Sequence, residues 1–294
     1  MGQRLFGFRF PRRLISAAAT TAPIIPDISF KSMSENNPAD LFDEFGRCIP
    51  AESVGAHRKS RRYFQIAKPE IDYAAILERS VRHFGNSIAD ELDAARFQAR
   101  VESILEGLSK DLATKNITRG VGIPFIVPKT TEADIGAALE KTYLPAVAAA
   151  FHEKLPDATF KNHNRHPLDG QLGIVSGSRH ESLIEAAGRS AVVGIYFPCL
   201  SEYSVPGAVA QTKLLPEQFT LAGGYDTCAA LVGTPDLLIR ADGYPPLLWL
   251  GALETQDKTS GFHFEAYGLN LTFNHRGHHD KMAEYWWCGL SVLG

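Results

Sequence analysis

The chain has 294 residues, of which 45% are hydrophobic and 21% are charged, an ordinary balance for a globular protein. Its formal net charge of −3 at pH 7 disfavours nucleic acid as a partner, because nucleic-acid-binding domains usually carry a basic surplus. A protein with this net charge can still carry a local basic patch. No segment approaches ~18 consecutive apolar residues, so we expect no membrane-spanning helix.

The first 26 residues differ from the rest in charge. They contain no Asp or Glu but four arginines, Arg4, Arg9, Arg12 and Arg13, whereas all 33 carboxylates of the chain lie in the remainder. An acid-free segment rich in Arg, Ser and Ala is typical of a transit peptide, so residues 1–32 predict a mitochondrial leader. Two alternatives stay open: an export signal around Arg12-Arg13, or a cytoplasmic protein that starts at Met33.

Residues 33–69 are polar and turn-rich, which predicts a linker. Within them lies the basic run His57-Arg-Lys-Ser-Arg-Arg62. Short basic runs are common on solvated segments, and such a run can also contact a phosphate backbone or another anionic surface.

Residues 70–118 predict a helical hairpin. Apolar residues recur at intervals of three and four over 71–84 and again over 87–114, which gives each segment one apolar face. Gly85-Asn86 separates the two segments, and so short a connection favours an antiparallel pair.

Residues 119–294 predict a sheet-containing body, in one domain with the hairpin. Short β-branched and apolar runs predict strands over 121–127, 171–175, 191–197, 246–254, 262–267, 269–273 and 285–293. Residues 131–134 are expected to lead into a long helix that runs to about 155 and is kinked or split near Leu144 by Pro145. Further helices are expected over 179–188, 211–218 and 225–232. The expected class is α+β: an N-terminal helical hairpin followed by a mixed, mostly antiparallel sheet with flanking helices.

Four cysteines, Cys48, Cys199, Cys228 and Cys288, lie far apart in the sequence. Their spacing fits neither a zinc ribbon nor a short disulfide scaffold, so we expect reduced thiols. Cys199 and Cys228 lie in apolar surroundings and predict small buried side chains.

An acidic motif lies in residues 233–256, where Thr-Pro-Asp236 and an apolar run are followed by a turn and a second apolar run ending at Glu254. If both runs are strands of a hairpin, the two carboxylates come together and can bind Mg²⁺. Such a metal polarises a phosphoryl oxygen and helps to form hydroxide.

This motif resembles the PD-(D/E)XK nuclease superfamily over about 25 residues. The resemblance implies metal-dependent cleavage, with Pro235-Asp236 as the first element and Glu254 as the second acidic group. Gln256 stands where the family has lysine, and Lys258 lies two residues further on. The alternative is that Asp236 caps a turn and that Glu254 is a solvated strand end.

Histidines form the second candidate site, since His275, His278 and His279 lie within five residues of one another near the C-terminus. Histidines at intervals of three or four can hold Zn²⁺ on one face of a helix, but Arg276-Gly277 favours a tight loop, in which clustered surface histidines need no metal. His163 and His166 form a similar pair in a polar loop.

The sequence contains no Walker loop, no Gly-x-Gly-x-x-Gly motif and no Gly-x-Ser-x-Gly elbow. Aromatic residues on the expected C-terminal strands predict the core of the sheet, with a pocket or partner surface as the alternative. The leading interpretation is a binding or assembly protein without a catalytic role, for which a protein partner fits. The alternatives are a divergent metal-dependent nuclease or hydrolase using Asp236, Glu254 and Lys258, and a zinc protein using the C-terminal histidines.

Overall fold

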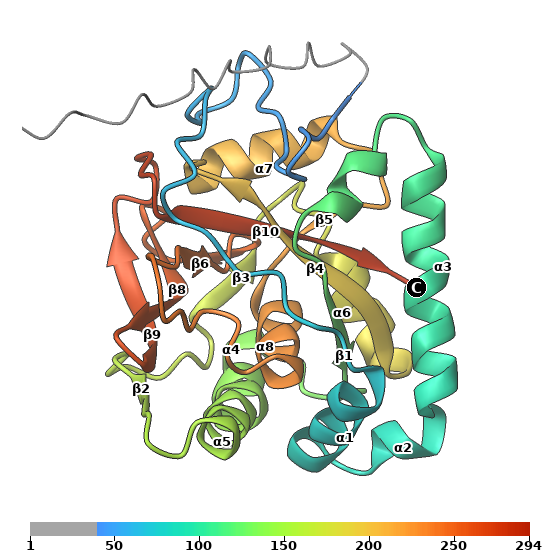
Figure 1. Cartoon of the computed structure of the whole chain (residues 1–294). Coiled ribbons are helices and arrows are strands. Elements are labelled where there is room, and N and C mark those ends of the chain that lie inside the picture. Colours follow the sequence, from blue (N-terminus) through green and yellow to red (C-terminus); the bar gives the residue numbers. More distant parts are fainter. Residues whose placement is uncertain (1–39) are drawn as a thin grey trace, which may run out of the picture. The chain divides into compact units, whose positions relative to one another are not determined.

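A mixed sheet of eight strands organises residues 40–294, the part of the chain that the computed structural model describes (Figure 1). The strands run in the order β1 (Ile123–Val127), β4 (Val192–Ser201), β10 (Trp286–Leu293), β6 (Leu247–Trp249), β8 (Ser260–Tyr267), β9 (Asn270–Gly277) and β2 (Phe160–Asn162), and β5 (Thr220–Leu221) also pairs with β10. Only the β10–β6 and β9–β2 pairs in this sheet are parallel. A separate antiparallel pair joins β3 (Leu172–Ile174) to β7 (Leu253–Thr255). The predicted mixed, mostly antiparallel sheet is confirmed.

Helices cover both faces of this sheet. One face packs against α4 (Ile135–Ala138), α5 (Leu144–Lys154), α6 (Glu181–Arg189) and α8 (Gly224–Gly233), and the other against α2 (Ser87–Glu91), α3 (Ala94–Lys110) and α7 (Val205–Leu214). α1 (Tyr73–Phe84) lies beside β1 and contacts helices of both groups, α5 and α8 as well as α3. Side chains of β4 alternate between the two cores, with Tyr196 in the first and Ile195 and Phe197 in the second. This alternation follows from the two-residue period of a strand and explains why β4 is buried along its whole length. The α+β class is thereby confirmed.

The expected helix over 87–114 is broken into α2 and α3. Leu92 takes an extended backbone conformation, and Asp93 then caps α3 by accepting a hydrogen bond from the Arg96 N–H at 2.8 Å. A side-chain cap of this kind satisfies an amide that has no partner within the helix. Gly85 ends α1 at the predicted position.

Pro145 splits the long helix near Leu144, as predicted. A π-helical turn (η2, Leu139–Tyr143) separates α4 from α5, which begins at Leu144. Proline has no N–H to donate to the carbonyl four residues earlier, and the wider turn accommodates that gap. The helix starts at Ile135, directly after the lead-in expected over residues 131–134, because Asp134 caps it through the Ala137 N–H.

Two predicted strand boundaries are wrong. The strand expected to end before Pro198 continues as β4 to Ser201, because Pro198 lies where the β4–β10 register shifts between Cys288 and Leu290 and the regular ladder is interrupted. The strand expected over 246–254 is divided into β6 and β7 by a turn. The aromatic side chains of β6, β8 and β9 are largely in the core, as expected, except for Tyr267, which is 81% exposed.

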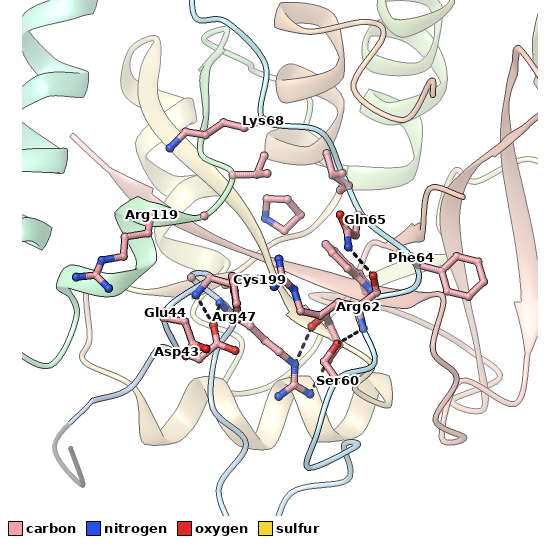
Figure 2. A pocket seen from close by; sticks show the side chains of 18 residues that line it. Asp43, Glu44, Arg47, Ser60, Arg62, Phe64, Gln65, Lys68, Arg119 and Cys199 are labelled. Carbon is pink, nitrogen blue, oxygen red and sulfur yellow. Dashed lines mark hydrogen bonds between the residues drawn. The ribbon is translucent and has the colours of Figure 1, made fainter. Parts of the chain in front are cut away.

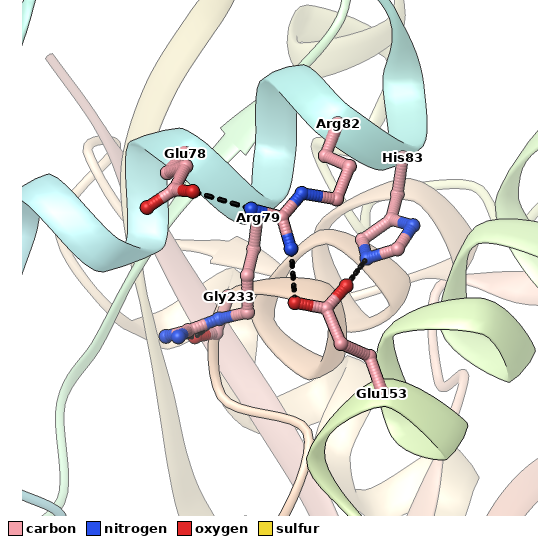
Figure 3. A network of polar contacts seen from close by, with 6 residues as sticks. All are labelled: Glu78, Arg79, Arg82, His83, Glu153 and Gly233. Atoms are coloured by element: carbon pink, nitrogen blue, oxygen red, sulfur yellow. Dashed lines mark hydrogen bonds and ion pairs between the residues drawn. The ribbon is translucent and has the colours of Figure 1, made fainter.

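Polar contacts tie α1 to α5 and α8 (Figure 3). Arg82 forms ion pairs with Glu78 and Glu153, and His83 Nε2 lies 3.0 Å from Glu153 Oε2. Arg79 donates from Nε to the Gly233 carbonyl at 3.1 Å, which satisfies an acceptor at the end of α8. The exposed ion pairs contribute on the order of 0–1 kcal/mol each, so orientation of α1 is their main effect.

Residues 40–69, which the sequence predicts as a linker, pack along the body without forming a helix or strand. Phe42 and Cys48 are fully buried, and the Cys48 N–H donates to the Cys199 carbonyl at 2.9 Å. The His57 N–H donates to the Glu202 carbonyl at 3.1 Å. The segment therefore follows β4 where β1 no longer pairs with it. Within residues 40–294, no helix combines the length and hydropathy needed to cross a membrane.

Candidate functional site

A pocket lies where β1 stops and β4 continues. β1 pairs with β4 only as far as the Ile123–Tyr196 position, which leaves Pro198, Cys199 and Ser201 to form one wall. The opposite walls come from residues 43–47, residues 60–68 and the loop 119–121 (Figure 2). The pocket encloses about 240 Å³.

A tight turn forms the wall at residues 43–47. Asp43 Oδ1 accepts hydrogen bonds from the N–H groups of Phe45 at 3.0 Å and Arg47 at 2.8 Å. Gly46 has a φ of +79°, a conformation that glycine adopts without a steric penalty. Burial raises the pKa of Asp43, and the hydrogen bonds from Arg47 and Phe45 oppose that rise. Asp43 therefore shapes the wall by holding the turn.

Cationic side chains outnumber carboxylates in the lining. Arg47, Arg62, Lys68 and Arg119 contribute four positive groups, against the two carboxylates of Asp43 and Glu44. None of the four forms an ion pair with a carboxylate of the described chain. The pocket thus concentrates positive charge on a protein whose net charge is −3.

Arg47 is held in place by neutral oxygen atoms. Its Nε donates to Ser201 Oγ at 2.8 Å, and its Nη2 donates to the carbonyls of His57 at 2.7 Å and Ser201 at 3.0 Å. These contacts orient the guanidinium group without a direct ion pair, although the nearby Asp43 carboxylate offsets part of its charge. Arg47 therefore joins β4 to the covering segment and also adds to the positive potential.

The other three cations are less restrained. The Arg62 guanidinium lies over the Phe45 ring, 3.3 Å from its centroid, which orients it by a cation–π contact. Lys68 Nζ donates to the Thr118 carbonyl at a long 3.4 Å, and the Arg119 side chain forms no hydrogen bond with the described residues. Lys68 and Arg119 therefore keep most of their hydrogen-bonding capacity for a ligand.

The rest of the lining is mixed: Ser60, Gln65 and Ser201 are polar, and the apolar residues include Phe64, Ile66, Val121, Pro198 and Trp287. Cys199 also reaches the pocket, but burial raises the pKa of its thiol well above the ordinary value. A protonated thiol is a poor nucleophile, so Cys199 acts here as an apolar wall residue. All four cysteines are free and buried, which confirms the burial predicted for Cys199 and Cys228.

Asp236 and Glu254 lie in different local settings. Residues 237–239 form no strand, so the predicted hairpin around Asp236 is wrong: α8 ends at Gly233, and Asp236 lies in the turns that follow. Its carboxylate is 3.7 Å from Lys154 Nζ. Glu254 lies on β7 and is 3.5 Å from Lys258 Nζ. Each carboxylate thus has its own lysine partner.

His275 and His279, two of the C-terminal histidines, have different hydrogen-bond partners. His275 on β9 lies 2.9 Å from Ser260 Oγ, and His279 is buried with its Nε2 2.7 Å from the Lys258 carbonyl. His278 is exposed and has a φ of +61°, in the loop that follows β9. Residues 40–294 contain no group of three His, Cys, Asp or Glu side chains placed to hold a metal ion.

A fully buried polar cluster at the start of α8 combines Ser291, Asp226 and His180. Ser291 Oγ donates to Asp226 Oδ2 at 2.6 Å, while His180 Nδ1 is 4.0 Å from the same oxygen. Asp226 also caps α8 through the Gly223 and Thr227 N–H groups. Because the serine donates to the aspartate and none of the three side chains is exposed, this cluster does not form a nucleophile–base pair.

Only one of the four pocket cations belongs to a pattern that is visible in the sequence. The basic run 57–62 contains Arg62, but Arg47, Lys68 and Arg119 are single basic residues without a diagnostic spacing. Only the packing of residues 40–69 against β4 brings them together. The chain matches no protein-family model, no curated protein and no solved structure.

Proposed function

We propose that this protein binds a small anionic ligand in the pocket between β4 and residues 43–68. One observation carries the proposal: four cationic side chains line the pocket without a carboxylate partner among the described residues. Unpaired like charges in one pocket repel one another, and a bound anion removes that repulsion. The proposal agrees with the leading interpretation of the sequence, a binding protein.

The lining favours a phosphate or carboxylate group attached to a flat apolar portion. Arginine and lysine bind such oxyanions through charge-assisted hydrogen bonds, and Phe64 and Trp287 offer apolar contact. A volume of about 240 Å³ suits a ligand smaller than most drug-sized molecules.

The test is calorimetric titration of the full chain with inorganic pyrophosphate. We expect saturable binding that weakens as salt is added, since exposed charges are screened. Lys68→Gln and Arg119→Gln should each weaken binding about tenfold or more, as expected for the loss of a charge-assisted hydrogen bond.

Two matched variants control for the loss of charge alone. Lys161→Gln on β2 and Arg189→Gln on α6 remove exposed cations outside the pocket and should leave the affinity unchanged. The pocket variants should unfold at the same temperature as the parent or slightly higher, because they relieve repulsion. An affinity that falls equally in pocket and control variants would contradict the proposal.

The metal-dependent alternatives stay predictions and need a separate measurement. Titration with Mg²⁺, Mn²⁺ and Zn²⁺ in turn should show saturable binding if either is correct. Loss of Mg²⁺ or Mn²⁺ binding in Glu254→Ala would support the nuclease hypothesis, and loss of Zn²⁺ binding in His279→Ala would support the zinc hypothesis. No binding of any of the three metals would end both.

A further inference from the structure

We propose that the anion bound in the pocket is a phosphate of a single-stranded nucleic acid, with a neighbouring base stacked on an exposed tyrosine pair beside the pocket. This inference rests on the proposed function and adds the class of ligand. The two tyrosines of the exposed pair are Tyr63 and Tyr244.

Tyr63 and Tyr244 stack on each other on the surface. Their ring centroids are 5.4 Å apart with an interplanar angle of 21°. They are 59% and 58% exposed, respectively, although two stacked rings hide part of each other. Large exposed aromatic surfaces are costly in water and are typical of binding sites.

The backbone holds this pair rigidly. Phe64 and Tyr244 form a parallel β-bridge, and the Gln65 N–H donates to the Tyr244 carbonyl at 3.1 Å. Arg240 adds a hydrogen bond from Nη1 to the Gln65 carbonyl at 3.1 Å. A platform fixed in this way loses little conformational entropy when a planar ligand stacks on it.

Phe64 connects the platform to the pocket. Its ring centroid lies 5.1 Å from that of Tyr63 and 5.6 Å from that of Tyr285, and Phe64 is also one of the residues that line the pocket. Arg62, next to Tyr63 in the chain, also lines the pocket. A phosphate near Arg62 and a stacking surface on Tyr63 are therefore adjacent.

Charge favours a polyanion over an uncharged sugar or peptide. Arg61 and Arg240 border the aromatic pair, and each has one carboxylate contact, Glu284 at 3.0 Å and Asp242 at 3.6 Å. The Arg61 side chain is 79% exposed and can donate hydrogen bonds to backbone phosphates, whereas Arg240 contributes mainly its charge because it already bonds to Asp242 and Gln65. Stacking on aromatic rings beside a positively charged groove is the usual mode of single-strand binding. The net negative charge of the chain does not prevent this, because the positive groups are local.

The experiment measures fluorescence anisotropy of the full chain with three ten-nucleotide probes: oligo-dT, oligo-U and an abasic oligomer of equal charge. We expect oligo-dT or oligo-U to bind at least tenfold more tightly than the abasic oligomer, since only the former offer bases to stack. Comparison of dT with U distinguishes DNA from RNA.

Variants separate stacking from charge. Tyr63→Ala and Tyr244→Ala should each weaken oligo-dT or oligo-U binding about tenfold and leave abasic and pyrophosphate binding unchanged. Tyr63→Phe and Tyr244→Phe keep the ring and should retain affinity. Lys68→Gln and Arg119→Gln should weaken binding of all three oligomers and of pyrophosphate.

The outcomes distinguish this inference from the proposed function. Pyrophosphate binding without tighter binding of base-containing oligomers overturns the nucleic-acid inference and leaves the anion pocket standing. The nucleic-acid inference is also overturned if the tyrosine-to-alanine variants bind oligo-dT and oligo-U as tightly as the parent protein does. Failure of pyrophosphate and all oligomers to bind overturns both.

Discussion

Gly46 and Gly120 meet at the rim of the pocket, where the turn at residues 43–47 touches the loop after η1 (Lys115–Arg119). A Cβ atom on Gly46 would lie 2.6 Å from the Gly120 nitrogen and 2.7 Å from its Cα. The φ of +79° at Gly46 adds a second constraint, because residues with a side chain rarely adopt it. Two backbones thus approach closely enough to place Asp43 and Arg119 in the same pocket.

Gly46→Ala should therefore destabilise the fold by about 2 kcal/mol or more, combining the left-handed backbone penalty with overpacking. Urea unfolding measures this. The matched control is Gly188→Ala on α6, where a Cβ meets nothing within 4 Å, and the control should be neutral or slightly stabilising. If Gly46→Ala retains full stability, the close contact does not constrain the pocket.

At the scale of a single element, β8 pairs a buried histidine with a half-buried glutamate. His263 is fully buried against Trp249, with ring centroids 4.9 Å apart, and its Nε2 lies 3.5 Å from Glu265 Oε2. Burial lowers the pKa of His263 below 6.5, and the neighbouring Glu265 opposes that shift. The contact with His263 lowers the pKa of Glu265 below 4.5, with further help from Arg276.

Both pKa shifts make the folded protein less stable at acid pH. The unfolded chain binds a proton at His263 near pH 6.5 while the folded protein resists it, so stability falls as the pH drops through this range. The Glu265 contribution is present above pH 4.5 and is lost as the pH falls through its lowered pKa. The two losses follow one another from near neutral pH downwards.

His263→Gln should reduce the loss of unfolding free energy between about pH 7.5 and pH 5, with each protein referred to its own value at the higher pH. Urea unfolding at both pH values measures the difference. His163→Gln replaces an exposed histidine and should decline with pH as the parent does. A His263→Gln variant with the parent's full decline would show that this histidine does not set the pH dependence.

At the scale of the whole molecule, the C-terminal strand β10 lies inside the sheet and connects its two parts. β10 lies between β4 and β6, antiparallel to the first and parallel to the second, so the last residues of the chain join two halves that are distant in sequence. Gly289 sits at the irregularity in this strand, where a Cβ would lie 2.1 Å from a Tyr196 ring atom. The central position of β10 makes completion of the sheet depend on contacts made at the end of the chain.

Residues 1–32 lie outside the described residues, and their role as a mitochondrial leader is our proposal from composition. Fused to a fluorescent reporter, they should direct it to mitochondria, because a basic, acid-free segment suits an organellar transit peptide. The control replaces Arg4, Arg9, Arg12 and Arg13 by Gln and should leave the reporter cytosolic. A parent fusion that also stays cytosolic would end the proposal and favour the cytoplasmic alternative.

The sequence by itself determined those elements whose signals are local. Apolar periodicity and the stop at Gly85 predicted α1, Pro145 predicted the split before α5, and short β-branched and apolar runs predicted β8 and β9. These signals arise within a few turns of helix or one strand, so the residues that decide them are neighbours in the chain.

Only the tertiary structure decided the place of β10, the continuation of β4 past Pro198 and the composition of the pocket. A strand's partners depend on the whole sheet, and an interrupted ladder tolerates a proline that local rules treat as an end. The pocket depends on Arg47, Lys68 and Arg119, which are ordinary surface cations when read singly. Their convergence follows from long-range packing of residues 40–69 on β4, an effect that no short sequence pattern encodes.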